Sequence, residues 1–328
     1  MTVGGWDGRG LPPAAGARIE RATAAGLPTS LLSAGGLAGL ERAGFEPAGE
    51  VLGTAVMQVS WLGYHGCGWQ RGVAGVWYPP PVMAGQWFGY EPYSQAIRQG
   101  LDKALTRMRD EAAALGADGV VGVRLTEERI PAEKIEFTAL GTAVRSRGRQ
   151  RPERPFTTDL AGQDLAKLLA AGWMPAAIVY GLSVAVRHDD SRANGHRTYF
   201  GGNTEVTSYT ELLTHVRAAA RQEFAAEVAR LGGDGALMSG VQSRIWPVEA
   251  TGNDHRDNAA ECLVTGNAIT QFHPGHMPIT GSLTVLPLPS PPSRKANRVD
   301  VGPGQRWSRQ LAVTSRSGRF AACESNRP

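Results

Sequence analysis

His65 and Cys67 are the side chains of this sequence that best fit a soft-metal site. An imidazole nitrogen and a thiolate both bind Zn²⁺ or Cu⁺, and a single glycine separates the two residues. A closed zinc site needs further ligands, and the only acidic residue in the surrounding segment is Glu91. The pair predicts a site for a divalent or soft metal ion, with two ordinary loop residues as the open alternative.

Two other histidine-containing segments have metal-ligand residue types in a less suitable setting. His273 and His276 flank a Pro-Gly turn, so they do not share one face of a helix. Another group lies in a polar segment rich in Gly and Asn, where solvated charge is the preferred interpretation: His188, Asp189, Asp190 and His196.

Carboxylates recur at equivalent positions in the two halves of the chain. Glu111 and Glu227 fall on two long helical segments. They could be paired acids at an oligomer axis, but exposed helix carboxylates are the preferred interpretation. Asp118 and Asp234 each precede a glycine at a helix-to-strand corner, which is ordinary turn chemistry. The sequence lacks a GxSxG elbow, a P-loop, an HExxH motif and a strand-linked GxGxxG. A binding protein is therefore predicted, with an enzyme of unrecognised site as an open alternative.

Residues 60–93 form an aromatic loop with nine of the aromatic side chains, many glycines and three consecutive prolines. Trp and Tyr dominate binding hot spots, and long loops in compact domains are often functional. Burial against the sheet or a neighbouring subunit is the alternative interpretation. The candidate partner-contact residues are Trp61, Tyr64, Trp69, Trp77, Trp87 and Phe88.

The elements that position these residues are predicted from an internal repeat. Residues 37–61 match residues 165–186, with Gly53 aligned to Gly181, and two later blocks repeat in the same order. Three matched blocks in one order indicate a duplicated unit. The fold class predicted is α+β, with a first repeat over 28–145 and a second over 157–284.

Each repeat is expected to contain a short helix, a strand, a long helix and two further strands. Apolar residues spaced three and four apart predict the long helix 93–115, packed on a small, mostly antiparallel sheet. Ser94 is expected to cap that helix, and Ser208 to cap its counterpart 209–231. The strands are predicted at 50–60, 120–125 and 136–144 in the first repeat, and at 177–187, 235–245 and 260–270 in the second.

Three segments lie outside the predicted repeats. Residues 1–27 are expected to be a flexible arm, and 146–156 a basic linker. Residues 285–328 carry eight Lys and Arg against two acidic residues, a net +6, which leaves −2 for the rest of the chain. This Pro-, Ser- and Arg-rich tail is predicted to be disordered and suits an anionic protein or membrane surface. No specific nucleic-acid partner is indicated.

Cysteine usage and hydropathy predict a cytoplasmic protein. Three widely spaced cysteines without a CxxC pair do not indicate a disulfide framework. Residues 168–186 carry no charge and approach the length of a membrane span. Their counterpart in the first repeat carries several charges, so we interpret this stretch as a helix end followed by a buried strand.

The segments EAAALGADGVVGVRL (111–125) and ALGTAV (139–144), with the opening strand GEVLGTAV (49–56), resemble the YbjQ-like family of small bacterial proteins. The second repeat is similar, with Gly233 and Asn267 as departures. The resemblance implies a YbjQ/dodecin-like α+β unit, ring-shaped homo-oligomers, notably pentamers, and heavy-metal binding. The matched positions are packing and turn residues, so no ligand residue carries over.

Together these features predict a non-enzymatic, oligomeric binding protein. The alternative is a scaffold or adaptor that uses the aromatic loop and the basic tail to contact a protein or an anionic membrane surface.

Overall fold

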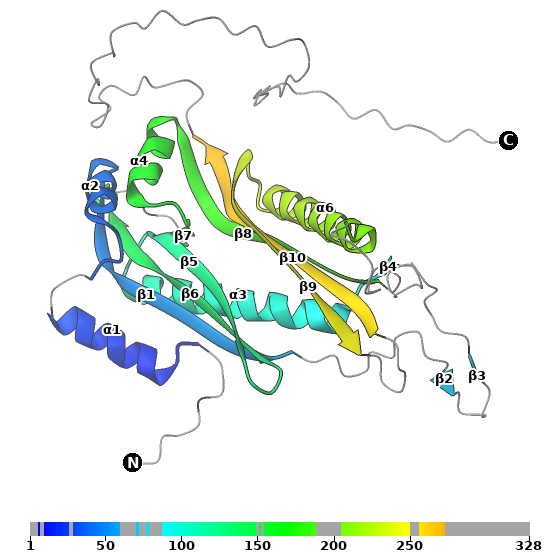
Figure 1. Ribbon diagram of the computed structural model, residues 1–328. Helices are drawn as coiled ribbons and strands as arrows, with labels where there is room; N and C mark the ends of the chain where they lie inside the picture. The colour runs from blue at the N-terminus through cyan, green and yellow to red at the C-terminus, as the bar shows by residue number, and fades with distance from the viewer. Residues whose placement is uncertain are drawn as a thin grey trace, which may run out of the picture. The chain divides into compact units, whose positions relative to one another are not determined.

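The structure is a computed structural model that describes residues 6, 10–25, 29–59, 70–71, 77–78, 87–148, 151, 154–187, 205–249 and 256–272. Helices and strands are mixed along these residues, and two four-stranded sheets form the framework (Figure 1). A two-stranded pair, β2 (Gln70–Arg71) with β3 (Trp77–Tyr78), is separate from them. The fold is α+β, as predicted from the sequence.

The first unit is built around one sheet with the strand order β1-β6-β5-β7. All neighbours in it are antiparallel except β5 and the short strand β7 (Phe156–Thr157), which are parallel. Its other elements, in chain order, are α2 (Ala34–Arg42), β1 (Phe45–Gln58), α3 (Glu91–Ala114), β5 (Gly119–Ile130) and β6 (Lys134–Ser146).

The second unit has the same order of elements and the same order of its long strands. Its sheet runs β4-β8-β10-β9, in which β4 (Trp87–Phe88) is contributed by the segment before α3. The remaining elements are α4 (Gly162–Ala170), β8 (Trp173–Arg187), α6 (Thr207–Arg230), β9 (Gly235–Glu249) and β10 (Arg256–Gln271).

The apolar stripe predicted for the first long helix is its buried face. Ile97, Leu101 and Met108 are almost completely buried where α3 packs on β1. Gly53 of β1 lets the strand approach so closely that a Cβ there would overlap the backbone of α3. Gly181 has the same relation to α6, so glycine sets the helix-to-sheet distance in both units.

The predicted serine caps of the two long helices were wrong, and each helix begins two residues before its predicted start. The helix α3 begins at Glu91 with Tyr90 as its N-cap residue, and α6 begins at Thr207, in both cases without a side-chain cap. Proline in the first turn of α3 is compatible with this earlier start. The Ser94 hydroxyl instead donates to the carbonyl of Tyr90 inside the helix.

The predicted flexible arm contains a helix, α1 (Pro13–Ala25). Its sequence is rich in alanine, the strongest helix former, and proline stands at its first position, where the missing N–H costs nothing. Arg18 of this helix forms an ion pair with Glu111 of α3.

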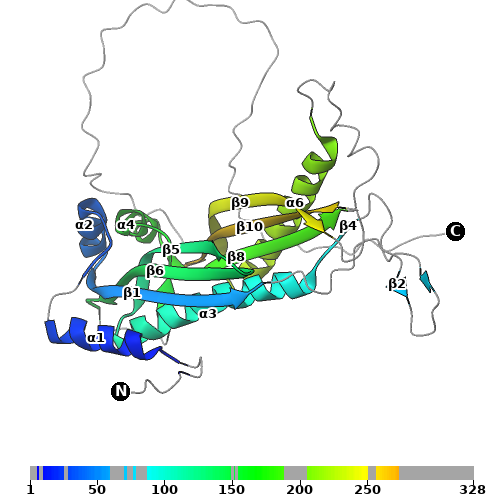
Figure 2. The same cartoon turned by 60° about the horizontal axis from the view of Figure 1, so that its bottom comes forward.

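The two units are joined through backbone and core contacts. Helices α2 and α4 lie side by side, and their glycines bring the two backbones into contact (Figures 1 and 2). Strand β7 adds to the sheet of the first unit and then leads into α4. Ile178, Leu182 and Leu263 of the second unit belong to the same core cluster as α3.

Polar contacts also hold α3 against the second unit. Arg98 Nε donates to Glu223 Oε1 at 3.0 Å, and the Tyr180 hydroxyl donates to Asp102 Oδ1 at 2.7 Å. Burial and the carboxylate of Asp102 both raise the pKa of Tyr180 above its usual value, so this phenol stays a neutral donor. No helix among the described residues is long and apolar enough to cross a membrane.

Candidate functional site

A buried polar network connects the two units at the start of α3. The Tyr93 hydroxyl donates to Glu261 Oε2 at 3.0 Å, and Arg129 donates to the Tyr93 oxygen at 2.9 Å. Arg244 holds the same carboxylate through two N–H donors, at 2.9 Å and 2.6 Å. The guanidiniums of Arg244 and Arg129 lie 4.6 Å and 5.9 Å from the ring centroid of Trp246.

Each member of this network comes from a different part of the fold. Tyr93 lies in the first turn of α3, Arg129 in β5, Arg244 in β9 and Glu261 in β10. Tyr93 and Glu261 are 1% and 4% exposed, so their polar atoms need protein partners. Burial, followed by the nearby carboxylate of Glu261, raises the pKa of Tyr93 and keeps it a neutral hydrogen-bond donor.

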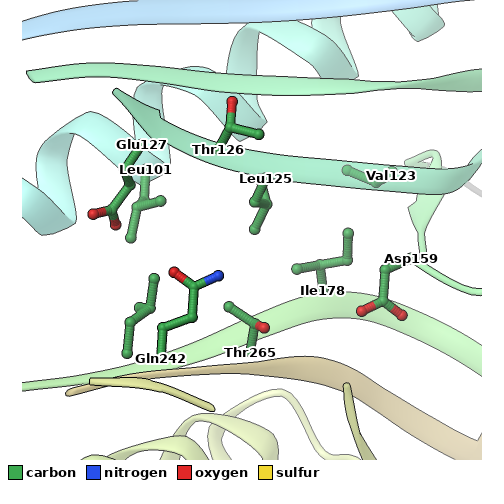
Figure 3. Close-up of a pocket in the computed structure, with 10 residues that line it drawn as sticks. Leu101, Val123, Leu125, Thr126, Glu127, Asp159, Ile178, Gln242 and Thr265 are labelled. Atoms are coloured by element: carbon green, nitrogen blue, oxygen red, sulfur yellow. The ribbon is translucent and has the colours of Figure 1, made fainter. Parts of the chain in front are cut away.

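Two adjoining cavities lie beside this network, between β5 of the first unit and the sheet of the second. Their volumes are about 270 and 280 Å³, and Glu127, Gln242 and Leu263 line both of them. The lining of the first cavity extends from Glu127 to Asp159 (Figure 3). The second includes Arg129, Arg244 and Glu261 of the network itself.

Glu127 is the titratable side chain at the junction of the two cavities. Its Oε1 atom is buried and has no hydrogen-bond partner among the described residues. Burial raises the pKa of this carboxyl to about 7, with the carboxylate of Glu261 adding to the rise and Arg244 opposing it. An unpartnered acceptor in a cavity can hold a cation or a hydrogen-bond donor, so Glu127 is the centre of the candidate site.

The raised pKa of Glu127 has a consequence for stability. The folded pKa of about 7 exceeds the reference value of 4.5, so the stability that this group contributes is complete in acid and is lost as pH rises through 7. We expect Glu127→Gln to raise the free energy of unfolding at about pH 8 by up to roughly 3 kcal/mol, and to have little effect at about pH 4. Urea denaturation across this pH range measures the difference. Glu128→Gln, on the exposed neighbour, is the control; equal pH profiles for wild type and Glu127→Gln would contradict the prediction.

Most of the side chains selected from the sequence lie outside the described residues. These are His65, Cys67, Trp61, Tyr64 and Trp69, together with the histidine groups at 188–196 and 273–276. For Trp77 and Phe88 only the backbone is described, in β3 and β4. Metal binding at His65 and Cys67 stays a prediction.

Trp87 is the one partner-contact candidate whose side chain is described, and it packs within its own chain. Its ring stacks on His215 of α6 at 5.2 Å with an interplanar angle of 18°. The guanidinium of Arg187 lies 4.9 Å from the same ring. Contact of Trp87 with a partner stays a prediction.

The described part of the chain contains no group of three or more His, Cys, Asp or Glu side chains placed to hold a metal ion. Cys262 is buried in the core of the second unit, among apolar residues. These residues therefore do not fit a heavy-metal centre, and the chemistry of the site comes from Glu127 and the network beside it.

The turn interpretation of Asp118 and Asp234 is confirmed. Asp118 Oδ2 accepts the N–H of Ser146 at 2.7 Å, and Asp234 Oδ2 accepts the N–H of Gln271 at 2.9 Å. Each carboxylate thus fastens the start of one strand to the end of its neighbour, which is a structural role.

The prediction that Glu111 is an exposed carboxylate was wrong. Glu111 is 1% exposed, accepts the N–H of Leu52 at 2.8 Å and pairs with Arg18. Its position three residues after Met108 continues the apolar stripe, a signal that the sequence contained. Glu227 lies nearer the surface and pairs with Arg230.

Sequence reasoning also missed Tyr93, Glu127, Arg244 and Glu261 as site residues. Single Glu and Arg residues on strands give no local motif, and their convergence depends on how the two sheets meet.

Comparisons with known proteins agree with this architecture. A family model described as "Putative heavy-metal-binding" matches residues 83–147, which include α3, β5 and β6. UPF0145 proteins of Halorubrum lacusprofundi and Archaeoglobus fulgidus are each 47% identical to the chain, over 55 and 57 residues. The chain spans about half the length of these two relatives, since 53% of each is aligned.

A more extensive relationship links the chain to the encapsulin nanocompartment protein Rv1762c of Mycobacterium tuberculosis. The two are 32% identical over 293 residues, which cover 85% of this chain and 98% of the relative. The chain therefore belongs to the same family as the M. tuberculosis encapsulin nanocompartment protein, and its residues 83–147 match the YbjQ-like family model.

Proposed function

We propose that this protein is a non-enzymatic, self-assembling binding protein that works in an encapsulin-type nanocompartment. The observation that carries the proposal is the relationship to the M. tuberculosis protein over 98% of that relative's length. We further propose that the two units are tandem copies of one ancestral YbjQ-like unit, because their elements follow one another in the same order. Assembly is supported by a difference between the two units.

Within the described ranges β9 is an edge strand of the second sheet, and it exposes positions that are covered in the first. In β5, Val120 and Val123 are 0% and 4% exposed where β7 pairs beside them. The equivalent residues of β9, Ala236 and Ser239, are exposed. Met238 and Val241 on the same strand are 48% and 41% exposed. An uncovered strand edge with apolar side chains is a surface suited to pairing with another strand.

The segment Thr29–Leu31 forms hydrogen bonds with the first unit. Equivalent bonds connect β7 and the residues after it to the second unit. The Leu31 N–H donates to Thr142 Oγ1 at 3.0 Å, and the Glu50 N–H donates to Thr29 Oγ1 at 3.2 Å. The counterpart bonds are Asp159 N–H to Asn267 Oδ1 at 3.2 Å and Ile178 N–H to Thr157 Oγ1 at 3.0 Å. Thr29–Leu31 therefore occupies, on the first unit, the position that β7 occupies on the second. From that position β7 pairs with β5 of the other unit.

We infer that Thr29–Leu31 of one copy pairs with the start of β9 in the next copy. This contact between two chains would reproduce the parallel pairing that β7 and β5 form within one chain. A head-to-tail contact of this kind closes into a ring when the rotation between copies allows it. The ring-like homo-oligomer expected from the sequence is the assembly that we propose.

Charged substitutions at the β9 edge test this contact. We expect Met238→Asp combined with Val241→Asp to lower the mass of the assembly in solution, because two carboxylates would be buried at the joint. Light scattering coupled to size exclusion measures the mass. Thr106→Asp, on an exposed position of α3, should leave it unchanged. A wild-type chain that is monomeric at micromolar concentration would refute self-assembly.

Co-expression with an encapsulin shell protein tests the compartment. We expect this protein to elute with the shell and to resist added protease until the shell is opened. If all of the protein elutes separately from intact shells, the association is refuted. This outcome does not depend on the oligomeric state of the chain.

The scaffold alternative, in which the aromatic loop and residues 285–328 contact a protein or an anionic surface, stays a prediction. The packing of Trp87 against His215 shows that one part of the loop is occupied within the chain.

A further inference from the structure

The first of the two cavities has a carboxyl group at each end and apolar walls between them. Figure 3 shows Glu127 and Asp159 at opposite ends of the lining, with Leu125 and Ile178 between. Leu101 and Leu263 add further apolar wall, and Gln242, Thr126 and Thr265 supply the other polar groups. Among the described residues, no Lys, Arg or His side chain lines this cavity.

Both carboxyl groups have capacity left for a ligand. Glu127 Oε1 is buried without a hydrogen-bond partner among the described residues. Asp159 Oδ1 accepts a hydrogen bond from the Asn267 side-chain amide at 2.6 Å, which orients that carboxylate. Its second oxygen accepts no hydrogen bond from the described residues. A buried acceptor without a partner costs free energy, which a bound donor would recover.

We propose that this cavity binds a short linear aliphatic diamine, with one ammonium at Glu127 and the other at Asp159. This proposal is independent of assembly and of the nanocompartment. The methylene chain would lie against Leu125 and Ile178, and each ammonium would form a charge-assisted hydrogen bond with its carboxylate.

The form of the cavity decides between ligand classes. A small hydrated metal ion needs several oxygen ligands around one point, whereas these two carboxyl groups lie at opposite ends of an apolar wall. A monoamine would leave one carboxylate unpaired, and an anion would meet two acidic groups and no cationic one. The volume of about 270 Å³ leaves room for a short methylene chain between the two carboxyl groups.

Isothermal titration of the full-length protein with 1,4-diaminobutane and 1,5-diaminopentane tests the proposal. We expect one diamine to bind per chain, and 1-aminobutane to bind at least tenfold more weakly. Magnesium chloride at the same concentration controls for simple charge screening and should give no saturable binding. A failure of both diamines to bind, or equal affinity for the monoamine, would overturn the proposal.

Variants locate the ligand. Glu127→Gln and Asp159→Asn should each weaken diamine binding by at least tenfold, whereas Glu128→Gln, on the same strand but outside the cavity lining, should bind as wild type does. Leu125→Trp fills the space without changing a charge and should abolish binding. Circular dichroism confirms that each variant is folded. Undiminished binding to folded Glu127→Gln and folded Leu125→Trp would place the diamine elsewhere and reject this site.

Discussion

Alanine at Gly53 or Gly181 is expected to destabilise this protein severely. A methyl group at Gly53 would overlap the carbonyl oxygen of Ala104 in α3, and one at Gly181 would overlap that of Ala220 in α6. The clash involves helix backbone, which cannot turn away as a flexible side chain can. We expect each variant to lose about 3 kcal/mol of unfolding free energy, or more, since the helix must move off its sheet.

Urea denaturation of the purified variants measures this loss. Gly16→Ala is the matched control, because its Cβ in α1 would have no atom within 4 Å; it should keep or slightly raise stability, by roughly 0.5–1 kcal/mol. Wild-type stability in both Gly53→Ala and Gly181→Ala would mean that the strands and helices are farther apart than the structure places them.

Removal of Arg244 is the second substitution with a large expected effect. Arg244→Met leaves the carboxylate of Glu261, 4% exposed, without its cationic partner and with only the Tyr93 hydroxyl as a donor in the network. Breaking a buried ion pair from one side costs about 3–5 kcal/mol. The Arg244 side chain is 31% exposed, so we expect a loss of about 3 kcal/mol, at the lower end of that range.

The double variant Arg244→Met, Glu261→Gln separates the two causes of this loss. It should recover part of the stability, because no unpaired charge is left in the interior. Arg230→Met removes an arginine from a surface pair with Glu227 and should leave the unfolding midpoint unchanged. Arg244→Met should also move the pKa of Glu127 further above 7, since Arg244 opposes that rise. An unchanged Glu127 titration would contradict the placement of these two groups.

Local sequence patterns predicted the elements of the fold well. The stripe of Ile97, Leu101 and Met108 gave a helix with one buried face because the 3.6-residue period is a property of the chain alone. Asp118 and Asp234 were recognised as corner residues from the glycine that follows each of them, and their carboxylates accept backbone N–H groups at those corners. Helix starts were less accurate, since α3 and α6 begin without the side-chain caps on which that prediction relied.

The YbjQ-like resemblance was likewise recognised from packing and turn residues, because the family's fold requires those residue types. Such residues say little about ligands, so the metal site predicted at His65 and Cys67 rested on residue type alone. The described residues bring no comparable group together.

By itself, the sequence of this protein determined its α+β class, its helix and strand order and its family, because each depends on patterns within one short stretch of chain. Only the tertiary structure decided the site. Tyr93 and Glu261 are 168 positions apart, and Glu127 meets Gln242 only where β5 faces the second sheet. The raised pKa of Glu127 comes first from its burial, and burial is a property of the packed units that no local pattern contains.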